Sequence, residues 1–110
     1  MKLIKSIVRP TKVDDVRAAL EKLNVAGMTV TDVRGHGRQK GHTAVYRGKE
    51  YSVSLIPKVE IDVVVPNDLA EAAVAAIVEA ARTGEIGDGR VFVFPAEQGY
   101  NIRTGERDSQ

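Results

Sequence analysis

Three segments of the chain combine glycine with arginine, a pairing that suits the binding of phosphate groups. They are residues 34–38, 82–90 and 103–107. Backbone amides in such segments can surround phosphate oxygens, while a guanidinium supplies charge and paired hydrogen bonds. The second segment is not a P-loop, because it lacks the Gly-Lys-Ser/Thr ending and leads from an expected helix into an expected strand. The plain interpretation of residues 82–90 is a helix end followed by a tight turn. The tetrapeptide Arg-Thr-Gly-Glu occurs at both 82–85 and 103–106, and chance or turn chemistry explains this repeat.

Other reactive residue types indicate no standard catalytic or metal site. His36 and His42 are separated by six positions, with no cysteine and no obvious carboxylate partner. No serine stands in a nucleophile-elbow motif. Lys58 comes immediately before an apolar strand, where its plain interpretation is an edge lysine that discourages aggregation. The acidic residues of the first predicted helix are expected on its solvated face: Asp14, Asp15 and Glu21.

The elements that position these residues follow a repeated order. Residues 2–9 predict a strand that ends at Pro10, and apolar residues at helical spacing then predict a helix that runs from a capping signal at Thr11 and Asp14 to just before Gly27. Residues 28–34 predict the second strand. The second half predicts a strand over 59–65, a helix and a strand over 90–94. The buried stripe of that helix is expected at Leu69, Ala73, Ile77 and Ala80. The same helix has a capping signal at Asp68 and Glu71 and a stop at Gly84.

This order, strand–helix–strand twice, is that of the ferredoxin-like split βαβ fold, an α+β architecture. We expect one domain over residues 1–110, with an antiparallel sheet and both helices on one face. Between the second and third strands, nearly twenty polar, glycine-punctuated residues predict a structureless connection. Such connections are uncommon in small domains, and they are usually either functional or a sign of a misread element. The glycines and the tyrosines next to charged residues favour the functional interpretation.

Composition narrows the classes of function. The 110 residues are 43% hydrophobic and 28% charged, with no cysteine and a net charge of +1. These values argue against a membrane protein and a broad nucleic-acid surface, and they exclude disulfides and thiolate chemistry. We expect a cytoplasmic protein, because no secretory signal is visible at the N-terminus. A small core of alanine and valine favours a homo-oligomer.

Five segments at matching spacing resemble the PII nitrogen-regulatory family over nearly the whole chain. The two strongest are Tyr46-Arg47-Gly48-Lys49-Glu50-Tyr51, which resembles that family's T-loop (about 37–55), and residues 83–93, which resemble its C-terminal signature with the B-loop (about 82–90). Residues 28–31, 35–42 and 102–106 agree in register, the last within a C-terminal loop and tail at about 98–110.

The resemblance implies a homotrimer with ATP or ADP in clefts between neighbouring copies. It implies that the phosphates contact Gly35, Gly37, Arg38, Gly87, Asp88, Gly89 and Arg90, with Arg103 from the adjacent copy. It implies that the adenine contacts Ile7, Thr29 and Val64, with Asp62 nearby. It also implies that 2-oxoglutarate is bound by Lys58 and by the backbone around Gln39, Lys40 and Gly41, with Mg²⁺ held through Gln39 between ATP and 2-oxoglutarate.

The implied function is a non-enzymatic regulator in which these ligands select the conformation of the T-loop. A ligand shifts such an equilibrium only through its differential affinity for the states. Implied partners are an ammonium transporter or nitrogen-metabolism enzymes, and a nucleotidyltransferase is implied to modify Tyr51. Contact with a membrane would come only through a transporter.

Four positions depart from the family pattern: Lys49, Asp62, Arg90 and Asn101. Asn101 stands where an arginine commonly assists the phosphates, so ATP affinity or ATP/ADP preference could differ. Two alternatives therefore stay open. One is a relative on the same fold with another small ligand, such as bicarbonate or a metal, and the other is a slow ATPase, for which no acid is clearly placed to orient water.

Overall fold

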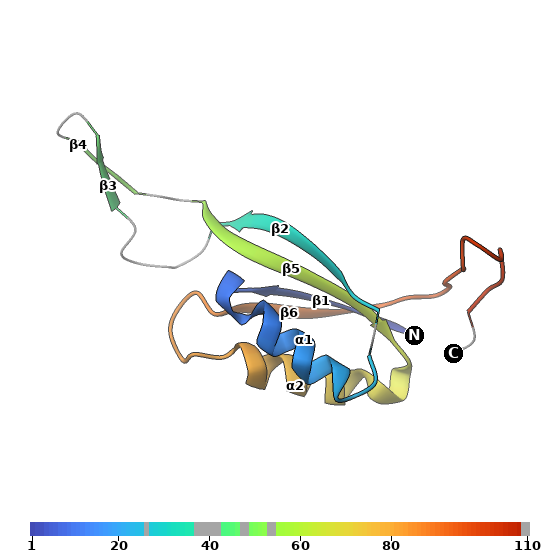
Figure 1. The fold of residues 1–110 in the computed structure, drawn as a ribbon. Helices are drawn as coiled ribbons and strands as arrows, with labels where there is room; N and C mark the ends of the chain where they lie inside the picture. Colours follow the sequence, from blue (N-terminus) through green and yellow to red (C-terminus); the bar gives the residue numbers. More distant parts are fainter. Residues whose placement is uncertain (26, 37–42, 47–48, 53–54, 109–110) are drawn as a thin grey trace.

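The computed structural model describes residues 1–25, 27–36, 43–46, 49–52 and 55–108 of the chain. Four strands form the main sheet: β1 (Lys2–Val8), β2 (Thr29–Gly35), β5 (Ile56–Val65) and β6 (Gly89–Pro95). Their order is β2-β5-β1-β6, and each neighbouring pair is antiparallel. The helices α1 (Val13–Glu21) and α2 (Ala70–Ala81) cover one face of this sheet (Figure 1). The predicted ferredoxin-like arrangement is confirmed.

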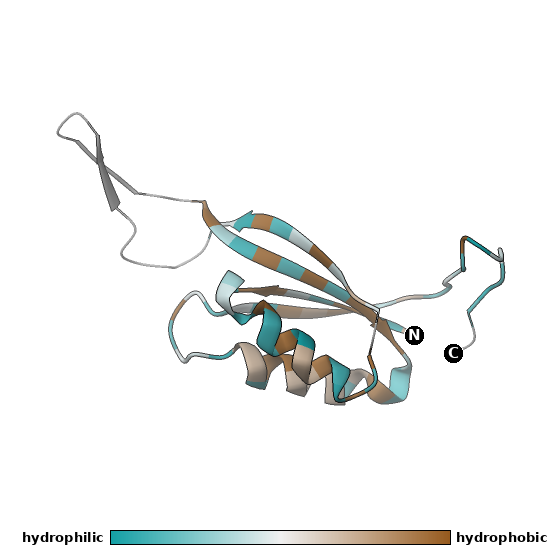
Figure 2. Cartoon of the chain, viewed as in Figure 1, coloured by the Kyte–Doolittle hydropathy of each residue, from teal (hydrophilic) through white to brown (hydrophobic). Residues whose placement is uncertain are grey.

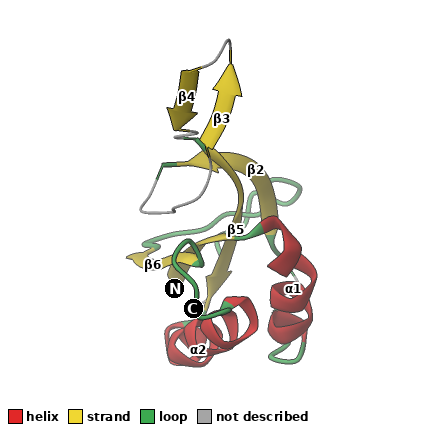
Figure 3. Cartoon of the chain, turned by 90° about the vertical axis from the view of Figure 1, so that its left-hand side faces the viewer, coloured by secondary structure: helices red, strands yellow, loops and turns green. Residues whose placement is uncertain are grey.

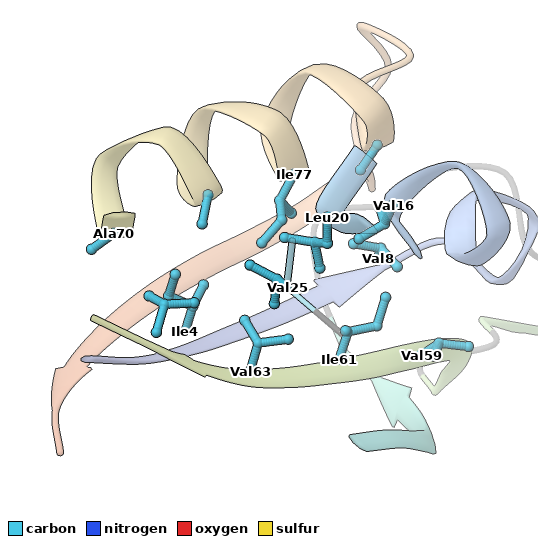
Figure 4. Close-up of a cluster of buried hydrophobic side chains, with 13 residues drawn as sticks. Ile4, Val8, Val16, Leu20, Val25, Val59, Ile61, Val63, Ala70 and Ile77 are labelled. Atoms are coloured by element: carbon cyan, nitrogen blue, oxygen red, sulfur yellow. The ribbon is translucent and has the colours of Figure 1, made fainter. Parts of the chain in front are cut away.

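The core lies between the helices and the sheet because side chains alternate along each strand. On β5, Val59, Ile61 and Val63 point to the helices and are buried (Figure 4). Hydrophilic and hydrophobic residues alternate along this strand (Figure 2), and Asp62 and Val64, at the intervening positions, are more exposed. Each helix contributes one apolar stripe to the same cluster. The fully buried members of the cluster include Ile4, Val16, Leu20, Ile61, Ala73 and Ile77.

The two helices begin differently from the prediction. Short 3-10 turns, η1 (Pro10–Lys12) and η2 (Asn67–Leu69), precede them, and neither N-cap residue makes a side-chain hydrogen bond. The capping boxes expected at Thr11 and Asp68 are therefore wrong, because both residues lie inside these turns. Proline fixes the backbone at the start of each turn, so the chain tightens before the helix begins.

Helix α1 ends before the predicted glycine. Asn24 has a φ of 60°, and the amides of Asn24 and Val25 donate to the carbonyls of Glu21 and Leu20 at 2.9 and 3.0 Å. This is a Schellman ending with asparagine in the left-handed position, so Gly27 is not the stop. Helix α2 likewise ends at Ala81, and Gly84 lies in the loop beyond it.

The long connection contains a second, two-stranded antiparallel sheet. Strands β3 (Thr43–Tyr46) and β4 (Lys49–Ser52) pair with each other, and β5 begins at Ile56 (Figure 3). The expectation of a structureless segment is therefore wrong, as is a start of the third strand at residue 59. Four residues per strand are too few for alternation to be recognised in the sequence.

The sheet face opposite the helices has no covering layer among the described residues, and we call it the open face. Apolar side chains stand on it, with Val64, Phe92 and Phe94 exposed by 52%, 44% and 43%. The register places Val64 and Phe94 on either side of Leu3. The open face is therefore a continuous apolar strip across the three strands β5, β1 and β6.

Candidate functional site

The loop between α2 and β6 is organised around the carboxylate of Asp88. The amides of Thr83 and Gly84 donate to its Oδ2 atom at 2.8 and 2.9 Å, and the Thr83 hydroxyl donates to Oδ1. The Nε atom of Arg9 also donates to Oδ1, at 3.1 Å. These hydrogen bonds, the Thr83 hydroxyl first, hold the pKa of Asp88 far below its usual range, although burial acts in the opposite direction.

Both carboxylate oxygens of Asp88 thus accept hydrogen bonds that hold the loop, whereas nearby backbone amides have no acceptor among the described residues. These are the amides of Gly87 and Asp88. Arg90 is exposed, and its guanidinium lies 5.5 Å from the Phe92 ring centroid without a carboxylate partner in the described part of the chain. Free amides next to an unpaired guanidinium are the features that an anion requires.

The glycines at and near this loop are present for different physical reasons. Gly87 and Gly89 have φ angles of 100° and 113°, which side chains rarely adopt. A Cβ atom on Gly89 would also stand 1.8 Å from the carbonyl oxygen of Ile7. Gly89 is therefore required by the pairing of β6 with β1. At Gly35, by contrast, a Cβ atom would meet only the Lys58 side chain, at an ordinary 3.5 Å.

Lys58 lies on the inner strand β5, so its interpretation as an edge lysine is wrong. Its residue is only 8% exposed, and its ammonium donates a hydrogen bond to the carbonyl oxygen of Gly87. Burial lowers the pKa of Lys58, the nearby charge of Arg9 lowers it further, and Asp88 partly opposes both. A desolvated ammonium beside a glycine loop is suited to bind a carboxylate.

The predicted adenine residues lie farther along the open face. The register pairs Thr29 with Asp62, and Val64 follows on the same face of β5. The Oδ1 atom of Asp62 is buried and has no hydrogen-bond partner among the described residues. Asp62 also raises the pKa of the adjacent Glu60 through a side-chain hydrogen bond and its charge, with burial adding to the shift. An unpartnered acceptor of this kind calls for a donor from outside the chain.

A pocket of about 310 Å³ opens beside the loop, where α2 meets β6. It contains four predicted site residues: Ile7, Asp88, Gly89 and Arg90. Its other walls come from α2, mainly Val74, Ile77 and Val78. Thr29, Asp62 and Val64 do not line it. Apart from Ile7, the predicted adenine contacts therefore lie away from the phosphate contacts of this pocket in one copy of the chain.

The third glycine–arginine segment lies at the other end of the sheet. Strand β6 starts at the loop and ends at Pro95, and residues 99–108 follow beyond that end (Figure 1). Arg103 is exposed there and does not join the other site residues. Within one chain, the structure brings together Gly35, Lys58, Gly87 and Asp88, but not Arg103.

The two Arg-Thr-Gly-Glu sequences form the same turn. In each, the threonine hydroxyl accepts the amide of the following glutamate, at 3.1 Å in the first and 3.2 Å in the second, and the glycine has a positive φ. The explanation by turn chemistry is therefore correct. In the second turn, Asn101 accepts the amide of Thr104 at 3.1 Å through its side-chain oxygen. Asn101 is a structural residue of that turn.

Several predicted contacts lie outside the described residues: Gly37, Arg38, Gln39, Lys40 and Gly41. The loop histidine His42 lies outside them too. The backbone of Tyr51 lies in β4, opposite Ala44. His36 is exposed at the end of β2. No group of three or more histidine, cysteine, aspartate or glutamate side chains forms a metal site within the described ranges. No helix among those ranges is long and apolar enough to cross a membrane.

Sequence reasoning missed Arg9 entirely. It follows β1 and lies outside every recognised motif, yet it contacts the loop near residue 88. A run of charged and glycine residues can be recognised in the sequence as a candidate binding loop. A contact between two residues 79 positions apart leaves no such local pattern.

The fold and this loop define a small ferredoxin-like domain with a glycine loop at one end of its sheet and an uncovered opposite face. Comparison with known proteins adds the family. The model for the nitrogen regulatory protein P-II family matches residues 1–106, and the chain belongs to that family of regulatory proteins.

Curated relatives agree with this assignment over almost their full lengths. Nitrogen regulatory protein P-II 1 of Escherichia coli K12 is 54% identical over 108 residues, which cover 98% of this chain and 96% of the relative. Nitrogen regulatory protein P-II of Haemophilus influenzae is 52% identical over the same coverage. The P-II protein of Rhizobium etli is 50% identical over 110 residues, with 100% and 98% covered.

Proposed function

We propose that this regulatory protein senses ATP or ADP together with 2-oxoglutarate, and transmits their state through the conformation of residues 37–55. The observation that carries the proposal is the position of Lys58. Its buried ammonium lies at the glycine loop, on the strand that leads directly from the long connection. Proposed targets are an ammonium transporter or nitrogen-metabolism enzymes, with Tyr51 as the residue that a nucleotidyltransferase modifies.

The phosphate end of the nucleotide fits the glycine loop. The free amides of Gly87 and Asp88 and the unpaired guanidinium of Arg90 supply hydrogen bonds and charge. Asp88 contributes its amide only, since its carboxylate is held by donors from the loop and by Arg9. Arg38 and Gly37 complete this set in the proposal, from outside the described residues.

The adenine end fits the open face. Adenine presents an amino group where guanine presents a carbonyl oxygen. The unpartnered Oδ1 atom of Asp62 would accept the adenine amino group and repel the guanine carbonyl. From Lys58 to Val64 the strand spans about 20 Å at about 3.3 Å per residue, so one extended ligand can reach both the loop and Asp62.

For 2-oxoglutarate, Lys58 supplies the charged contact, and the backbone of Gln39, Lys40 and Gly41 the other end. A carboxylate at Lys58 would replace the carbonyl oxygen of Gly87 as the acceptor of its ammonium. Gln39 would supply an oxygen to Mg²⁺, which favours such hard ligands. When bound, Mg²⁺ would offset the charge of the phosphates.

The open face supports the proposed homotrimer. Its apolar strip from Val64 through Leu3 to Phe94 would be covered by neighbouring copies. Arg103 lies at the opposite end of the sheet from the glycine loop, so it reaches the phosphates at that loop only if the tail of one copy meets the loop of the next. Such head-to-tail contacts close into rings.

Calorimetry tests the proposal directly. 2-Oxoglutarate is titrated into the protein with Mg²⁺, once with saturating ATP and once with saturating ADP. We expect binding with ATP and none with ADP. Absence of binding in both titrations would overturn the sensing of 2-oxoglutarate and favour a relative with another small ligand. Sustained release of phosphate from ATP, well above one turnover per minute, would favour the ATPase instead.

A further inference from the structure

Arg9 connects the end of β1 to the glycine loop through two contacts. Its Nε atom donates to the Oδ1 atom of Asp88 at 3.1 Å, and its Nη2 atom donates to the carbonyl oxygen of Ile86 at 3.1 Å. The side chains of Arg9 and Asp88 are both only 23% exposed. Charge-assisted hydrogen bonds at partly buried sites are stronger than those between neutral exposed groups.

The other donors to Asp88 all come from the same loop. They are the two amides and the hydroxyl of Thr83 and Gly84. Those contacts set the internal shape of the loop, but they do not fix its orientation relative to the sheet. Among the contacts to the Asp88 carboxylate within the described residues, only that of Arg9 reaches beyond the loop. Arg9 therefore acts together with Lys58, which donates to the carbonyl oxygen of Gly87, to fix where residues 86–88 point.

Charge gives Arg9 a second effect on the loop. An ionised carboxylate within a phosphate-binding loop would repel the phosphates. The guanidinium of Arg9 balances the charge of Asp88, so that the amides of Gly87 and Asp88 and the charge of Arg90 dominate the local field. The carboxylate of Asp88 is ionised at neutral pH, as an ordinary aspartate is, and its depressed pKa preserves this pair at more acidic pH as well.

We propose that Arg9 is a positioning residue for nucleotide phosphates: it holds residues 86–88 in the orientation in which their free amides meet the ligand. The inference rests on the nucleotide binding proposed above. Arginine is needed because its planar fork reaches two acceptors at once, whereas a lysine ammonium is a single point of charge. Lysine would restore the charge but only one of the two contacts.

The test compares adenosine, ADP and ATP affinities, measured by calorimetry with Mg²⁺, in the wild type and in Arg9→Gln and Arg9→Lys. For Arg9→Gln we expect about a 10- to 100-fold loss for ATP, the magnitude of one or two charge-assisted contacts, a smaller loss for ADP and little change for adenosine. Arg9→Lys should lie between Arg9→Gln and the wild type.

Arg17→Gln is the matched control. Arg17 makes two contacts of similar geometry, to Asp14 and Glu21 at 3.4 and 3.3 Å, but on the exposed face of α1. Its replacement should leave all three affinities unchanged. An equal loss of adenosine and ATP affinity in Arg9→Gln, or no loss at all, would overturn the positioning role.

Hydrogen exchange separates this inference from the proposed function. In the ligand-free protein, Arg9→Gln should accelerate exchange of the Thr83 and Gly84 amides, and Arg17→Gln should not. If the wild type binds no nucleotide, the proposed function fails and the phosphate role of Arg9 fails with it. Exchange then still decides whether Arg9 orients the loop. Unchanged exchange would refute that part as well.

Discussion

The ammonium of Lys58 donates to the carbonyl oxygen of Gly87, which joins an inner strand of the sheet to the loop before β6. The two residues are 29 positions apart in the sequence. Lys58 is buried without a carboxylate within salt-bridge distance among the described residues. The protein keeps a desolvated charge that a purely structural role does not require, because an apolar side chain would fill the same space.

Replacement of Lys58 by methionine should therefore separate stability from binding. Lys58→Met removes a buried charge, and water can solvate the half-buried Gly87 carbonyl. We expect a melting temperature that is unchanged or a few degrees higher. Calorimetry should show at least about a 10-fold loss of 2-oxoglutarate affinity. Lys12→Met, at a partly exposed ion pair with Asp15, should keep wild-type binding. Full retention of binding in Lys58→Met would remove Lys58 from the site.

Two glycine substitutions should differ strongly in their effect on the stability of the fold. Gly89→Ala introduces a Cβ atom into the backbone of Ile7 at a φ of 113°, which should destabilise the protein by several kcal/mol, on the order of 4 or more. Gly35→Ala meets only the Lys58 side chain at 3.5 Å and should fold with a near wild-type melting temperature. Thermal unfolding followed by circular dichroism compares the two variants.

Gly35→Ala should nonetheless weaken nucleotide binding if Gly35 is where a ligand approaches the backbone. Calorimetry with ATP measures this in the folded variant. Wild-type affinity in Gly35→Ala would show that the glycine has no part in the site.

Acid should weaken the glycine loop through Asp88. Its pKa is depressed in the folded protein, so its contribution to stability is complete above the unfolded value of about 4 and is lost as the pH falls toward the folded value. Asp88→Asn should therefore lower the melting temperature at pH 7 and have a smaller effect at pH 3. Asp14→Asn is the control, with a side chain that is 90% exposed. If the melting temperature of Asp88→Asn is lower than that of the wild type by the same amount at pH 3 and pH 7, Asp88 does not have this role.

Assembly can be tested with two matched valines. Val64 and Val30 both lie on strands and are exposed by 52% and 49%, but Val64 is on the open face, whereas Val30 pairs with Ile61 on the helix-covered face. For the proposed trimer, we expect Val64→Asp to give a monomer in analytical ultracentrifugation, whereas the wild type and Val30→Asp should give a trimer. A trimer in both variants would show that the copies do not meet at this face.

The sequence predicts the strand–helix–strand repeat well, because its signals are local. Apolar spacing in α1 and α2 and β-branched runs in β1 and β5 each span enough residues to be recognised. Helix boundaries are less predictable, since Asn24 takes the left-handed position that glycine was expected to take. The β3–β4 pair is too short to give such a signal.

Strand order explains why Lys58 could not be assigned from its neighbours in sequence. A lysine before an apolar run looks the same on an edge strand and on an inner strand, and only the pairing of β5 with both β1 and β2 decides between them. The link between Arg9 and Asp88 is likewise a consequence of β6 pairing with β1. The resemblance to a family supplied the candidate ligands, which composition and periodicity alone do not identify.

Strand β5 runs as one ten-residue segment, with its far end held between α1, α2 and the rest of the sheet and its near end beginning at Ile56, beside the long connection. Lys58 is only two residues from that near end, about 7 Å along the strand. In the proposed function, a ligand bound at Lys58 therefore lies very close to the long connection whose conformation it controls. The rest of the strand stays fixed in the packed core.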